Sequence, residues 1–269
     1  MSRQMKKVIK IILTVAFLFM ALANISPPAS ALEAQPVQIT IVYDNYPFQA
    51  GLKTSHGFSC LVRGMEKTIL FDTGGEDGEI LLQNLHALQV NPKDVDLVVI
   101  SHDHYDHVGG LAAFLRENNQ VTVFLPASCN ADLVKSVGEA KAKCVLVKDP
   151  LEICKNVYLT GQVLFEQALV LNTEKGLTVI TGCAHPGIVS MLYRAKEILP
   201  KNIDLVLGGF HLGALPEDGV KKIIRDFREL GVSKVGATHC TGDRAIQLFK
   251  DAYRDNYVPL GVGKVVKIL

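Results

Sequence analysis

The sequence lacks three features that would assign it to large classes of proteins. It has no excess of positive charge, since 28 Lys and Arg face 27 Asp and Glu over 269 residues. Its most apolar run is too short to span a bilayer, because only 16 residues separate Lys10 from Pro27, whereas a membrane helix needs about 20. No Pro/Ser-rich linker or low-complexity tract divides the chain. These absences argue against nucleic-acid recruitment and a membrane anchor, and they favour one domain.

The N-terminal segment has the three parts of a secretory signal peptide. Basic residues at positions 3, 6, 7 and 10 precede an apolar run over 11–23, and Ala29-Ser30-Ala31 matches an A-x-A cleavage site. We therefore expect cleavage after Ala31, export to the periplasm or the extracellular space, and a single mature domain over 32–269. Removing four basic and no acidic residues leaves 24 Lys and Arg against 27 Asp and Glu, a net charge of −3.

Hydrophobic periodicity predicts an α/β (α+β) fold. Segments of strand length fall at 37–43, 58–63, 67–72, 95–100, 121–125, 143–148, 163–165, 168–172, 177–181, 203–208, 233–238 and 264–268. Helical patterns fall at 79–88, 110–117, 130–138, 188–198, 217–230 and 243–254. Strands dominate, helices lie between them and tight hairpin turns are few, which indicates two mixed sheets covered by helices.

A metal site is predicted where the apolar strand 95–100 ends. His102 and His104 are two residues apart, so in extended backbone their side chains leave on the same face. Asp106 and His107 are expected in the turn before Gly109-Gly110, where the chain reverses towards a second point near the first. Imidazoles and a carboxylate suit Zn²⁺ and related divalent ions, and this crowding predicts two neighbouring cation positions.

This segment matches the HxHxDH signature of the metallo-β-lactamase superfamily. Segments elsewhere resemble motifs of that family in the same order: Ser55–Ser59, Phe71–Gly74, Thr181–Gly187, Gly208–Leu212 and Thr238–Gly242. The combination is similar to the subgroup named after the dihydropterin ribofuranosylaminobenzene phosphate synthase of methanopterin biosynthesis. The resemblance runs from about residue 37 to the end, and it implies an αββα sandwich with the metal site at the sheet edges.

Two later histidines also come at strand ends and complete the expected ligand set. His185 follows the strand at 177–181 and precedes Pro186-Gly187, while His239 ends the strand at 233–238. The six expected ligands, three for each ion, are His102, His104, Asp106, His107, His185 and His239. We expect two divalent ions, with zinc favoured and manganese or iron as alternatives.

His211 and Asp72 receive supporting roles. His211 falls about where the superfamily usually has a bridging aspartate, so it is either a ligand or a substrate contact that protonates the leaving group. We favour the second role and place it with Asp106 in the catalytic set. Asp72 is expected to accept the free N–H of a ligand histidine, as its counterpart in the family does.

All six cysteines belong to the predicted mature chain. Cys183 and Cys240 stand beside His185 and His239, so they either line the site, where a thiolate is a competent zinc ligand, or pack as small buried residues. Cys129, Cys144 and Cys154 are close enough in sequence to supply one disulfide, but the pairing stays open.

The expected reaction is hydrolysis by a metal-bound hydroxide, since no G-x-S-x-G nucleophile motif is present. Thr241 and Gly242 open the last helical pattern, where free backbone N–H groups suit an anionic group, and this favours a small phosphoester over a lactone or thioester. The alternatives are a synthase like that of the subgroup and a non-catalytic metal-binding or redox-sensing module using Cys183 and Cys240. A small-molecule substrate is the expected partner; the sequence leaves the oligomeric state open.

Overall fold

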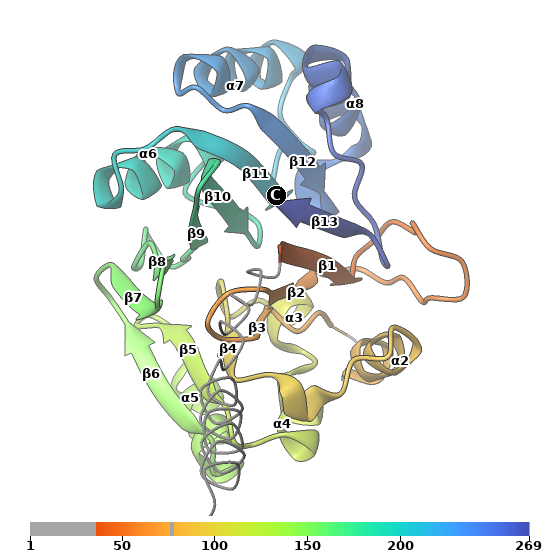
Figure 1. The fold of residues 1–269 in the computed structure, drawn as a ribbon, viewed down its shortest axis with the longest axis vertical. Coiled ribbons are helices and arrows are strands. Elements are labelled where there is room, and N and C mark those ends of the chain that lie inside the picture. The colour runs from red at the N-terminus through yellow and green to blue at the C-terminus, as the bar shows by residue number, and fades with distance from the viewer. Residues whose placement is uncertain (1–35, 76–77, 269) are drawn as a thin grey trace, which may run out of the picture. The chain divides into compact units, whose positions relative to one another are not determined.

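Two facing β-sheets organise residues 36–75 and 78–268, which are the residues described by the computed structural model (Figure 1). The first sheet has the order β13-β1-β2-β3-β4-β5-β6, with β1 (Val37–Tyr43), β2 (Ser59–Arg63), β3 (Ile69–Phe71), β4 (Leu97–Val99), β5 (Thr122–Pro126), β6 (Lys143–Val147) and β13 (Val265–Ile268). The second has the order β12-β11-β10-β9-β8-β7, with β7 (Leu151–Cys154), β8 (Val157–Leu159), β9 (Leu169–Thr173), β10 (Gly176–Thr181), β11 (Ile203–Gly209) and β12 (Lys234–Thr238). Both sheets are mixed, as predicted, because each joins antiparallel pairs to a parallel set.

Helices are inserted between the strands. The α-helices are α2 (Glu79–Ala87), α3 (Tyr105–Val108), α4 (Leu111–Glu117), α5 (Ala131–Glu139), α6 (Ile188–Ile198), α7 (Glu217–Glu229) and α8 (Asp243–Tyr253). Short 3-10 turns are η2 (Pro92–Asp94), η3 (His239–Thr241) and η4 (Arg254–Asn256). None of the helices within these described ranges is both long and apolar enough to cross a membrane.

The alternation of side chains along each strand builds four layers. In β2, Cys60 and Val62 pack into a core that also holds Leu169 and Leu207 from the second sheet, whereas Leu61 faces the core under α2, α4 and α5. In β11, Val206 points the other way, into the core under α6, α7 and α8. Figure 1 shows each helix group beside its own sheet. The predicted αββα sandwich, the metallo-β-lactamase fold, is therefore confirmed.

The strand directions bring several polar segments to one edge. β3 and β4 are parallel, β1 is antiparallel to β2 and β2 to β3, so β1, β3 and β4 all end at the same edge of their sheet. In the second sheet β10, β11 and β12 are parallel and likewise end together. The chain that leaves these six strands carries every candidate metal ligand of the site described below.

Three local predictions were wrong. Residues 163–165 form no strand, because Val163 and Glu166 exchange backbone hydrogen bonds across a tight turn in which Leu164 has a φ of 54°. β7 and β8 were missed; they form a hairpin that turns at Asn156, with a φ of 64°. Asp106 and His107 lie in the one-turn helix α3 rather than in an open turn.

The structure also bears on the expected disulfide and on the expected single domain. All six cysteines are free, so Cys129, Cys144 and Cys154 form no disulfide here. From Pro36 the chain forms one compact unit. The expected signal peptide, residues 1–31, lies outside the described residues.

Candidate metal centre

Three histidines point a buried ring nitrogen into the space at the sheet edges. Nε2 of His102 and of His185 is buried and has no hydrogen-bond partner among the described residues, and the buried Nε2 of His239 makes no hydrogen bond but lies 3.2 Å from Oδ2 of Asp106. Burying a polar nitrogen without a partner costs about 1–3 kcal/mol, so these atoms need a further partner. Divalent cations in two neighbouring positions would satisfy them, because neutral imidazole Nε2 is among the preferred ligands of such ions.

Hydrogen bonds to the opposite ring nitrogens explain why these imidazoles present Nε2. Nδ1 of His102 lies 2.9 Å from Oγ of Ser101, Nδ1 of His239 lies 2.9 Å from Oδ1 of Asn45, and Nδ1 of His107 lies 2.7 Å from Oδ2 of Asp72. The carboxylate of Asp72 and the amide oxygen of Asn45 accept, so Nδ1 carries the proton in His107 and His239. Nε2 of each ring is thereby left to face the site, as in metal-ligating histidines generally.

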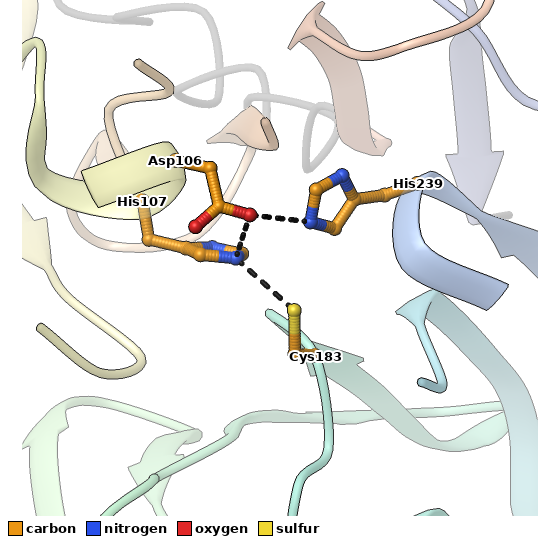
Figure 2. Close-up of side chains that lie close together, drawn as sticks. All are labelled: Asp106, His107, Cys183 and His239. Atoms are coloured by element: carbon orange, nitrogen blue, oxygen red, sulfur yellow. Dashed lines mark hydrogen bonds and ion pairs between the residues drawn. The ribbon is translucent and has the colours of Figure 1, made fainter. Parts of the chain in front are cut away.

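Asp106, His107, Cys183 and His239 form one group of candidate ligands. Figure 2 shows the four side chains converging from separate segments. Oδ2 of Asp106 lies 3.2 Å from Nε2 of His239 and 3.4 Å from Nε2 of His107, and Nε2 of His107 lies 3.2 Å from Sγ of Cys183. One ligand atom from each lies within 4.8 Å of the others, which suits one cation.

His102, Cys183 and His185 form a second group, whose ligand atoms also lie within 4.8 Å of one another. His104 adjoins this group: its ring centroid is 4.5 Å from that of His102 and 4.8 Å from that of His185. The structure therefore brings all six predicted ligands to one edge. Asp106, His107 and His239 fall in one group, His102 and His185 fall in the other, and His104 adjoins the second group.

The loop after β10 is held by a carboxylate that sequence reasoning missed. Glu166 is fully buried, and its two oxygens accept hydrogen bonds from the backbone N–H groups of Cys183 (2.9 Å), Ala184 (2.7 Å) and His185 (2.8 Å). A single Glu outside any helical or strand pattern gave no signal in the sequence. Its role depends on a loop that returns to it only in the folded chain.

Gly182 permits this loop to approach the site. An added Cβ at Gly182 would collide with the hydroxyl of Ser101 and the carboxylate of Asp72. Asp72 in turn accepts bonds from the backbone N–H of Ser101 at 2.7 Å and its hydroxyl at 2.8 Å. Asp72 therefore supports both His107 and the chain segment that leads into His102.

Asn45 and His56 were also not assigned to the site. Asn45 follows β1, so a polar residue directly after a buried strand was the available signal. His56 is exposed, and its Nε2 lies 3.2 Å from Oδ2 of Asp106 while its Nδ1 lies 3.3 Å from Nδ2 of Asn45. Both side chains thus contact the Asp106 group from the β1–β2 connection.

The expected substrate residues lie at the rim. His211 is exposed, its φ is 52°, and its ring centroid is 4.3 Å from that of His185. The hydroxyl of Thr241 is fully buried and committed to the fold, because it donates to the carbonyl of Thr238 at 2.6 Å and accepts from the N–H of Phe210 at 3.0 Å. Thr241 and Gly242 can therefore meet a substrate only through their backbone, at the start of α8.

Electrostatics keep the imidazoles neutral where ligands are needed. Burial lowers the pKa of His185 and of His239 to about 4 each, and it lowers the pKa of His102 well below the ordinary range. Burial also disfavours the charge of His107, but Asp72 and Asp106 outweigh it and raise the pKa of His107 to about 10. Burial opposes ionisation of Asp106, yet its close contacts with Nε2 of His107 and of His239 hold its pKa well below the usual value.

The chain is similar to known proteins. The model of the metallo-beta-lactamase superfamily matches residues 53–124. The chain is similar to the 7,8-dihydropterin-6-methyl-4-(beta-D-ribofuranosyl)-aminobenzene-5'-phosphate synthase of Methanocaldococcus jannaschii, with 28% identity in an alignment 280 positions long that covers 85% of this chain and 95% of that protein. YhfI of Bacillus subtilis, a metallo-beta-lactamase fold protein, shares the fold at 17% identity with a TM-score of 0.64, over 86% of this chain and 99% of that one.

A more similar solved structure is Tm1679, described as a metal-dependent hydrolase of the beta-lactamase superfamily. It is 32% identical, its TM-score is 0.73, and the alignment covers 86% of this chain and 99% of that one. The residue motifs, the four-layer sandwich and the histidine cluster at its edge agree with that similarity. The chain belongs to the metallo-β-lactamase superfamily of enzymes.

Proposed function

We propose that the protein is a metal-dependent hydrolase of a small anionic ester, with a phosphoester favoured, acting through two neighbouring divalent ions. The observation that carries this proposal is that the buried Nε2 atoms of His102 and His185, which lack partners, and that of His239, beside Asp106, fall into two neighbouring groups of candidate ligands. Such a set matches the nitrogen and oxygen chemistry that zinc prefers, with manganese and iron as alternatives. Divalent ions bound there would supply Lewis acidity and an activated water.

The chain's own residues would divide the work as follows. His102, His104 and His185 would hold one ion, while Asp106, His107 and His239 would hold the other. Asp72 and Asn45 fix the rings of His107 and His239 through Nδ1. These fixed orientations would leave positions open for water and substrate, as catalytic sites require.

His211 is proposed as the proton donor to the leaving group. It is exposed at the rim and lies beside His185, so it can reach a substrate bound at the ligand cluster. A positioned acid of this kind contributes about 10²–10⁴ in rate. His56, which contacts Asp106, lies on another side of the cluster and would bound the space available to the substrate.

An anionic substrate is favoured by the start of α8. This helix begins at Asp243, four residues after His239, so the backbone N–H groups of its first turn lie next to the ligand cluster. Helix N-termini favour anions through these unpaired donors and the helix dipole. The same feature would not favour a neutral lactone.

Turnover of bis-p-nitrophenyl phosphate by zinc- or manganese-loaded protein tests the proposal. The substrate should be hydrolysed by the wild type, not by His102→Ala, and at an unchanged rate by His86→Ala, whose side chain lies in α2. A panel of a lactone and a thioester, assayed in parallel, tests the substrate class. If the wild type hydrolyses the lactone or the thioester but not the phosphodiester, the preference for a phosphoester is wrong. If it hydrolyses none of the three substrates, the proposed hydrolase activity is wrong.

The synthase named for the Methanocaldococcus relative is the second candidate, because that similarity extends over 85% of this chain. A synthase that condenses a phosphorylated substrate releases its product only when both reactants are present. Incubating the metal-loaded protein with a pterin precursor and a phosphorylated ribose derivative, separately and together, distinguishes the two. Product formed only from the mixture would favour the synthase, and hydrolysis of a single ester would favour the hydrolase.

A further inference from the structure

Cys183 is the one described residue that belongs to more than one group of candidate metal ligands. Its Sγ belongs to the group with Asp106, His107 and His239, to the group with His102 and His185, and to a third group with His211 and Cys240 at the rim, in each case within 4.8 Å of the other ligand atoms. The thiol therefore lies between the two candidate cation positions. His211, which the sequence analysis placed near the family's bridging aspartate, lies at the exposed rim beside His185 instead.

The surroundings of Cys183 differ from those of a cysteine that serves only as packing. Cys60 belongs to the core between the sheets, Cys154 packs against that core, and Cys129 and Cys144 pack against the core under α2, α4 and α5. Cys183 is also buried, with 3% of its surface exposed, but it belongs to none of these apolar clusters. Its side chain lies 3.2 Å from a ring nitrogen, Nε2 of His107, and also neighbours the thiol of Cys240.

The position of the thiol is set by the backbone rather than by apolar contacts. The carboxylate of Glu166 holds the N–H groups of Cys183 and of the next two residues, and Gly182 allows the chain to pass against Ser101 and Asp72. Sγ is thus presented to the space into which Nε2 of His102 points without a partner, and into which Nε2 of His239 points beside Oδ2 of Asp106. Those two imidazoles are independent observations that a ligand belongs there.

We infer that Cys183 is a metal ligand, and that its thiolate bridges the two ions of the proposed function, on which this inference rests. An imidazole nitrogen binds one cation, whereas a thiolate sulfur has several lone pairs and can contact two. The thiol proton passes to solvent when the metal binds. Sulfur is a soft donor, so the pair of sites selects zinc or iron over magnesium and manganese.

Cobalt substitution tests the inference through a signal that does not depend on activity. The cobalt-loaded wild type should show d–d bands from its nitrogen and oxygen ligands and an intense near-ultraviolet thiolate-to-cobalt charge-transfer band. Cys183→Ser should lose the charge-transfer band and keep d–d bands. The matched control is Cys129→Ser, whose sulfur packs against the core under α2, α4 and α5. Cys240→Ser is a second comparison, because Cys240 shares a candidate ligand group with Cys183 and His211, and this variant should keep the band.

Each other outcome has a defined meaning. A charge-transfer band that survives in Cys183→Ser, or that disappears only in Cys240→Ser, overturns the inference. d–d bands without any charge-transfer band in the wild type overturn the cysteine ligand and leave the proposed function standing. Absence of all cobalt bands contradicts the proposed function as well, so the two failures are distinguishable.

Two further measurements guard against a variant that does not fold. X-ray absorption of the zinc-loaded wild type should contain a sulfur shell at about 2.3 Å besides the shorter nitrogen and oxygen shell, and a spectrum without sulfur overturns the inference. Cys183→Asp replaces the sulfur by a carboxylate that can also bridge. It should keep both ions by elemental analysis and shift the preference from zinc towards manganese; an unchanged preference overturns the predicted selectivity.

Discussion

Oδ2 of Asp72 lies 2.7 Å from Nδ1 of His107, and neither side chain is exposed to solvent. The same carboxylate accepts two bonds from Ser101, one residue before His102. One buried acid therefore orients ligands of both proposed cation positions without reaching the metal space itself. Removal of the Asp72 carboxylate should therefore weaken metal binding at both proposed cation positions.

Asp72→Ala should weaken metal binding and stability together. Loss of a partner that orients a ligand histidine typically costs about 10–100-fold in metal affinity, and breaking a buried ion pair costs about 3–5 kcal/mol in the free energy of unfolding. Metal titration and urea unfolding measure the two. Asp103→Ala is the matched control, because Asp103 accepts one bond, from the N–H of Asn130. Equal effects of both substitutions would contradict the role of Asp72.

The two cation positions should empty separately. His102→Ala or His104→Ala should lower the occupancy of one position, and Asp106→Ala or His107→Ala should weaken the other, because the ligand atoms fall into two groups. Elemental analysis of the purified variants checks this, with an expected wild-type content close to two ions per chain. Full occupancy after all four changes would refute the assignment.

His211→Ala should separate catalysis from metal binding. Since His211 is exposed and the other six ligands suffice, the variant should keep its metals and lose about 10²–10⁴ in turnover if the side chain donates a proton. A pH–rate profile that loses one limb would identify the donor. Loss of an ion in proportion to activity would instead make His211 a ligand, and unchanged turnover would leave it without a role in the reaction.

The metal-free protein should lose stability as the pH falls from about 6.5 to about 4. Burial lowers the pKa of His185 and His239 from 6.5 to about 4, so in this window the unfolded chain binds more protons than the folded one. His107, whose pKa is raised to about 10, contributes stability that is complete below pH 6.5 and is lost only as the pH rises towards 10, so it adds no slope in this window. Burial raises the pKa of Asp44 to about 7, which acts in the opposite sense between pH 4 and 6.5, so the test compares slopes among variants. Urea unfolding across the window should show a shallower pH dependence for His239→Gln than for the wild type or His86→Gln. A dependence of equal slope in all three would contradict the assignment.

Export remains a prediction from the sequence. The mature protein should begin at Leu32 and be found outside the cytoplasm, because the first 31 residues carry the basic, apolar and A-x-A parts of a signal peptide. Mass spectrometry of the N-terminus of protein purified from the cell checks this. An intact segment from Met1 to Ala31 on the mature protein would argue for a retained anchor.

The layers of the fold and the placement of the histidines at strand ends could be predicted from the sequence, because both depend on patterns within short segments. Each of His102, His185 and His239 follows a strand whose apolar pattern is legible in the sequence, and a strand end is a sheet edge. Glu166 acts on a loop 17 to 19 residues along the chain and no local pattern marks it, while Asn45, whose only signal was its place after a strand, acts on a partner 194 residues away. For Cys183 the sequence left open whether it lines the site or packs as a small buried residue, because its place depends on how the sheets face each other.

The contacts that join the chain's two ends have a consequence for folding. Asn45 meets His239, and Asp44 accepts the hydroxyl of Thr238, in both cases across 194 residues, while β13 pairs with β1. Contacts so distant in sequence close large loops and slow the folding of a domain. The ring of His239 can be oriented by Asn45 only once β12 has been synthesised and has docked. The complete set of metal ligands can therefore form only late in folding, after nearly the whole chain has left the ribosome.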